Sequence, residues 1–68
     1  MPVRIHLSRL MGERKLKIAD IARETDINRG TLTRLYYEKA ERVDLDVIEI
    51  LCRYLECEIG ELMEIVDE

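Results

Sequence analysis

The pattern of apolar and polar side chains changes its period after the first few residues. Residues 2–7, "PVRIHL", alternate apolar and polar side chains, which is the period-two pattern of a short strand. From Leu7 the apolar positions follow the spacing of a helix, with Leu10 and Met11 next, and this predicts a helix over about 7–14 and a turn at 15–17. The last residues, "LMEIVDE", alternate again and can form a second strand.

The helical pattern is stronger from Ile18 onward. Ile18, Ile21 and Ala22 fall on one face, and charged residues occupy the other, so a helix should end near Thr25. No glycine follows to end that helix. Asp26 can take the left-handed backbone conformation that often does so.

Another short helix is expected directly after the turn. The side-chain oxygen of Asn28 can accept an N–H of the first helical turn, which favours a helix over 29–36. Leu32 and Leu35 lie three positions apart on its inner face. A helix, a short turn and a helix with a shared core therefore span residues 18–37.

The second half of the chain predicts one longer helix and one short helix. Residues 38–44 read as a loop, and Asp44 can cap a helix that begins at Leu45. The apolar positions of this helix form a wide stripe: Val47, Ile48, Ile50, Leu51, Tyr54 and Leu55. A turn and a last short helix should follow, with Ile59, Leu62 and Met63 as its apolar positions.

Composition limits the architecture. The chain has 68 residues, which is enough for one small domain over residues 1–68, and 47% hydrophobic residues are enough to form a core. No apolar run approaches the roughly 20 residues of a membrane helix. The first ten residues contain no signal-peptide core, so we expect a cytoplasmic protein without a membrane partner.

The net charge of −4 is divided unevenly along the chain. Residues 1–42 contain ten Lys or Arg and six Asp or Glu, a net charge of +4. Residues 43–68 contain one Arg and nine acids, a net charge of −8. This division favours a basic functional surface and an acidic surface on the opposite side of the domain. The alternative is that the charges only keep the surface solvated.

The outer face of the helix at 29–36 contains long donors, hydroxyls and one glycine: Arg29, Gly30, Thr31, Thr33 and Arg34. No acid interrupts this face until Glu38. Such a face can donate hydrogen bonds to the bases and phosphates of nucleic acid, and the alternative is an ordinary solvated helix face.

Other chemistry has little support in the sequence. Ser8 is the only serine, and no glycine-rich phosphate loop or paired-carboxylate cleft is evident, so we expect no enzyme activity. Cys52 and Cys57 do not have CxxC spacing, and the single His6 lies far away in sequence, so we expect no metal. We interpret the cysteines as reduced, partly buried small hydrophobes, and no cofactor or small-molecule ligand is implied.

Residues 16–40, "LKIADIARETDINRGTLTRLYYEKA", resemble the helix-turn-helix of the phage-repressor and Cro family, also called the xenobiotic-response-element family. Residues 43–65, "VDLDVIEILCRYLECEIGELMEI", resemble the fourth and fifth helices of the same family. The similarity covers about residues 7–64. It implies an all-α, five-helix, lambda-repressor-like domain, similar to the very short members that are little more than the DNA-binding domain.

The resemblance also implies how DNA would be bound. The helix at 29–36 would enter the major groove with its N-terminal residues at base edges. Arg29 and Arg34 can each pair with guanine, Gly30 permits close approach of the backbone, and Glu38 would repel phosphate. The expected DNA-binding residues of the motif are Asn28, Arg29, Gly30, Thr31, Thr33, Arg34 and Tyr37. The expected flanking phosphate contacts are Lys17, Arg23, Lys39 and Arg42.

Two functions follow from these observations. The first is a sequence-specific transcriptional regulator that binds double-stranded DNA as a homodimer. Its dimer surface would be built by the two chain ends, which we expect to pair as strands within one chain, with pairing across a two-fold axis as the alternative. This pairing would bury Val3, Ile5, Ile65 and Val66. The second function is a protein-interaction module, antitoxin-like or anti-repressor, that uses the same fold without reading DNA.

Overall fold

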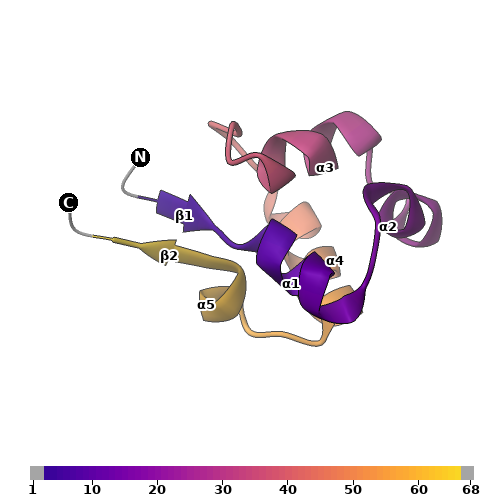
Figure 1. The fold of residues 1–68 in the computed structure, drawn as a ribbon. Coiled ribbons are helices and arrows are strands. Elements are labelled where there is room, and N and C mark those ends of the chain that lie inside the picture. Colours follow the sequence, from indigo (N-terminus) through magenta and orange to yellow (C-terminus); the bar gives the residue numbers. More distant parts are fainter. Residues whose placement is uncertain (1–2, 67–68) are drawn as a thin grey trace.

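The computed structural model describes residues 3–66, which form five helices and one two-stranded sheet (Figure 1). In chain order the elements are β1 (Val3–Ile5), α1 (Leu7–Arg14), α2 (Ile18–Thr25), α3 (Arg29–Tyr36), α4 (Leu45–Leu55), α5 (Ile59–Leu62) and β2 (Met63–Ile65). The five predicted helices are confirmed. The all-α class is not strictly correct, because the two strands pair into a sheet. No helix among the described residues is long and apolar enough to cross a membrane.

Three of the helices end on a residue in the left-handed conformation, and none of these residues is glycine. Asp26 ends α2 at φ 63° as predicted, and Lys15 and Glu56 end α1 and α4 in the same way. The helix α4 begins at Leu45 as expected, but the Asp44 side chain does not cap it. The backbone carbonyl of Asp44 instead accepts the first helical N–H groups.

The core draws on every helix and on the first strand. Its buried side chains are Ile5, Leu7, Leu10, Met11, Ile21, Ile27, Leu32, Leu35, Ile48, Leu51, Leu55 and Leu62. Two apolar residues that were assigned to helix stripes lie outside it, since Ile50 is 38% exposed and Ile59 is 60% exposed. Ile50 lies between Ile48 and Leu51, which share the inner face of α4, so its own side chain turns toward solvent.

The strands β1 and β2 pair antiparallel within the chain, in the register Val3↔Ile65, Arg4↔Glu64 and Ile5↔Met63. The pair forms a ribbon that projects from the helical body (Figure 1). Ile5 is buried at the inner end of the ribbon, and Val3 and Val66 are half-buried. The predicted burial of Ile65 is wrong, because the outer end of the ribbon extends past the helices and leaves this side chain 79% exposed.

Candidate nucleic-acid interface

The turn between α2 and α3 is fixed by one threonine. The Thr25 hydroxyl donates to the carbonyl of Ile21 at 2.6 Å and accepts the N–H of Ile27 at 3.3 Å. The N–H of Asp26 bonds to the Ala22 carbonyl, and Ile27 inserts into the core with only 8% of its surface exposed. Sequence reasoning missed the role of Thr25, although a threonine at a helix end is a known source of such local bonds.

The cap of α3 explains why a glycine follows it. The Oδ1 atom of Asn28 accepts the N–H of Gly30 at 2.7 Å and that of Thr31 at 3.4 Å, which confirms the predicted cap. A Cβ atom at position 30 would lie 2.9 Å from the same Oδ1 atom. Gly30 therefore leaves room for the capping side chain, a structural reason that is independent of any approach to DNA.

The two faces of α3 differ as the sequence predicts. Leu32 and Leu35 are buried, and Thr31 is half-buried at the edge. The outer face is exposed and carries Arg29, Gly30, Thr33 and Arg34, with Tyr37 just after the helix. This surface offers guanidinium and hydroxyl donors on a well-packed helix.

The basic side chains around α2 and α3 are mostly free of acidic partners. Within residues 3–66, no carboxylate lies within 4.0 Å of the charged nitrogens of Lys15, Lys17, Arg29, Arg34, Lys39 or Arg42. The other arginines, in contrast, are all paired. Among the expected phosphate contacts, Arg23 differs because it has acidic partners: Asp20 at 3.2 Å and Glu24 at 3.8 Å.

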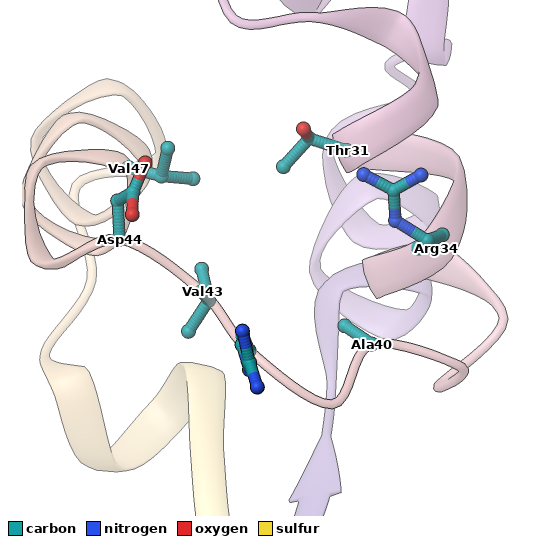
Figure 2. A pocket seen from close by; sticks show the side chains of 7 residues that line it. Thr31, Arg34, Ala40, Val43, Asp44 and Val47 are labelled. Atoms are coloured by element: carbon teal, nitrogen blue, oxygen red, sulfur yellow. The ribbon is translucent and has the colours of Figure 1, made fainter.

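A depression of about 170 Å³ separates α3 from the start of α4. Figure 2 shows Thr31 and Arg34 on α3 across this gap from Asp44 and Val47. Arg42 also lines it, so the structure brings three of the expected DNA-binding residues, Thr31, Arg34 and Arg42, to one depression. Asp44 and Val47 could not be identified as neighbours from the sequence, because their position depends on how α4 folds back.

Glu38 does not stand free beside the interface. Its carboxylate accepts the N–H of Ile5 at 3.0 Å and the Nε of Arg4 at 2.9 Å. The hydrogen bond from the Ile5 backbone, followed by the bond from Arg4, lowers the pKa of the Glu38 carboxyl below its usual range. The carboxylate that was expected only to repel phosphate thus ties the loop after α3 to β1, and its charge is paired with Arg4.

The two tyrosines at the end of α3 have separate environments. Their rings meet edge to face with centroids 4.9 Å apart. Tyr36 is half-buried against the core, whereas Tyr37 is 61% exposed. Tyr36 therefore packs in the domain, and the Tyr37 side chain is left at the surface.

Comparison with known proteins agrees with this geometry. A family model described as the Cro/C1-type HTH DNA-binding domain matches residues 6–68. The chain is also 27% identical over 64 residues to YozG of Bacillus subtilis (strain 168), described as an uncharacterized HTH-type transcriptional regulator, and the match covers 94% of this chain and 76% of that protein. No solved structure matches the chain. Because the family model spans nearly the whole sequence, this protein belongs to the family of Cro/C1-type helix-turn-helix DNA-binding domains.

Proposed function

We propose that this protein is a transcriptional regulator that binds specific sequences in double-stranded DNA, with α3 in the major groove. The observation that carries the proposal is the set of exposed basic side chains without acidic partners in the described chain. In a protein with net charge −4, carboxylates are plentiful, yet those of residues 3–66 include none within 4.0 Å of Arg29 or Arg34 on α3. The family and the description of YozG support the same function.

In this proposal the residues of the motif divide into two groups. Arg29 and Arg34 read guanine through paired hydrogen bonds, and Thr31 and Thr33 contact bases or phosphate oxygens. Asn28 uses its oxygen for the helix cap, so its amide nitrogen is the group that can donate to phosphate. The remaining contacts are with the phosphates of the DNA backbone. We assign them to the side chains of Lys17, Arg23, Lys39 and Arg42, the Tyr37 hydroxyl and the main chain at Gly30.

We further propose that the protein binds DNA as a homodimer. One helix of this kind reads only a few base pairs, so two copies on a near-palindromic site, with their α3 helices about 34 Å apart, would provide useful specificity. The ribbon of β1 and β2 is the proposed contact surface. Ile65 supports this choice, because an apolar side chain that is 79% exposed gains from being covered by a partner.

The test is a binding titration with the purified chain and labelled DNA from upstream of its own coding region. A scrambled duplex of equal length is the DNA control, and Arg53→Ala is the protein control, because Arg53 is exposed on α4. The parent and Arg53→Ala should prefer the upstream duplex, whereas the double variant Arg29→Ala/Arg34→Ala should lose the preference. Equal binding to both duplexes would reject sequence reading. Failure to bind any duplex would favour the protein-interaction module.

A further inference from the structure

The end of α4 brings the two cysteines of the chain together. In a continuous helix, residues five apart point about 140° away from each other. Here α4 stops at Leu55, Glu56 takes the left-handed conformation at φ 54°, and the chain folds back. The N–H of Cys57 then donates to the carbonyl of Cys52 at 3.0 Å.

This hydrogen bond is the long-range bond of the Schellman motif, which joins the second residue after the helix end to a residue in its last turn. A contact between those two side chains frequently accompanies the motif. Both cysteines also line one surface depression at this helix end. Burial, followed by the nearby Cys52 side chain, raises the pKa of the Cys57 thiol. The backbone bond and the shared depression therefore place both cysteines at one helix end.

Both thiols are within reach of small molecules. Each cysteine is half-buried rather than enclosed, and both line one surface depression together with Ile48 and Ile59. This depression is outside the set of residues assigned above to DNA. Residues 3–66 contain no group of three or more metal-ligating side chains, at the two cysteines or elsewhere, so the two sulfurs do not indicate a metal site.

We propose that Cys52 and Cys57 form a reversible intramolecular disulfide, and that low-molecular-weight disulfides are its oxidant. One protein thiolate attacks the small disulfide, forms a mixed disulfide and releases one small thiolate. The second protein thiolate attacks the protein-side sulfur of the mixed bond, forms the Cys52–Cys57 bond and releases the second small thiolate. The two protein thiols lose two electrons and two protons, and one small disulfide becomes two small thiols.

The experiment treats the full chain with glutathione disulfide under native conditions, then alkylates it in denaturant and measures its mass. The reduced chain takes up two alkyl groups, one for each cysteine, whereas the oxidised chain should take up none and lose two hydrogens. The product should be monomeric on a non-reducing gel, and its yield should not depend on protein concentration. Retention of both thiols, or only intermolecular cross-links, would overturn the proposal.

A second measurement, of the thermal unfolding midpoint, tests whether the native fold places Cys52 and Cys57 in a geometry that allows the disulfide. If it does, the oxidised chain should unfold at a midpoint roughly 5 °C or more above that of the reduced chain, since the bond closes a short loop without strain. The double variant Cys52→Ser/Cys57→Ser, treated with the same oxidant, should show no change. A lower midpoint in the oxidised parent would show that the native helix end has to distort, and it would reject the inference.

Discussion

The carboxylate of Glu38 accepts the backbone N–H of Ile5 at 3.0 Å, which fastens the loop after α3 to the first strand. Arg4 completes the contact with its Nε and Nη2 atoms at 2.9 and 3.2 Å. Glu38 itself adopts the left-handed conformation at φ 58°. Because the ionised Glu38 carboxylate accepts all three bonds, it fixes the position of this loop relative to the ribbon of β1 and β2.

The first prediction concerns the pH dependence of stability. The pKa of Glu38 is lowered in the folded chain, so its contribution is complete above the ordinary value of 4.5 and is lost as the pH falls through the lower native value. Glu38→Gln should reduce the urea midpoint at neutral pH and flatten its decline in acid. Glu41→Gln, at an exposed glutamate in the same loop, is the control. Parallel pH profiles for the parent and Glu38→Gln would contradict this role.

The second prediction concerns base reading. Replacing Arg29 or Arg34 with alanine should cost roughly 1–3 kcal/mol of binding free energy at the cognate base and should relax specificity there. The measurement is a titration against every single-base variant of the bound site. If both variants keep the selectivity of the parent, α3 does not read those bases.

The third prediction separates free cations from paired ones. Lys17→Gln, Lys39→Gln and Arg42→Gln should each weaken binding uniformly across sequences and reduce the slope of log affinity against log salt by about 1. Arg23→Gln should have a smaller effect, because Arg23 already pairs with Asp20 and Glu24. Unchanged slopes in the first three variants would remove them from the interface.

The fourth prediction couples the helix cap to the glycine beside it. Asn28→Ala should lower stability by about 0.5–2 kcal/mol through loss of the cap. Gly30→Ala should be unfavourable in the parent, because its Cβ would lie 2.9 Å from the Asn28 oxygen. In the Asn28→Ala background the same change should be neutral or stabilising by up to about 1 kcal/mol, since alanine favours a helix. A double-mutant cycle with no coupling energy would show that the contact is unimportant.

The fifth prediction tests the proposed dimer surface. Ile65 is so exposed in the single chain that Ile65→Glu should leave the thermal midpoint of the monomer nearly unchanged. It should nevertheless weaken self-association in sedimentation at micromolar concentration and reduce protection of the second half-site in a footprint. A parent chain that stays monomeric both free and on DNA would end the dimer proposal.

Helix positions could be predicted because they depend on nearby residues. Apolar spacing and the Asn28 cap predicted α3 over 29–36, and Asp26 predicted the end of α2, all within a few residues of the feature itself. The alternation at both chain ends also predicted the strands. Each strand needs a partner, which predicted pairing but also allowed pairing across a two-fold axis, and the structure shows the expected pairing within one chain.

The side-chain partners could not be predicted in the same way. Glu38 meets Arg4 and Ile5 only after the ribbon has folded back beside the loop, and no local pattern encodes that approach. The exposure of Ile65 depends on how far the ribbon projects beyond the helices. The backbone hydrogen bond between Cys57 and Cys52 depends on Glu56, a residue type without a preference for the left-handed conformation.

The pairing of Val3 with Ile65 joins positions that are almost a whole chain apart. During synthesis, β1 leaves the ribosome before β2, and it has no partner strand until β2 has been translated. The intervening helices have mostly local contacts and can form earlier. A chain cut anywhere before β2 would therefore keep an unpaired strand beside its DNA-binding motif, and that exposed edge is where association with other chains would begin.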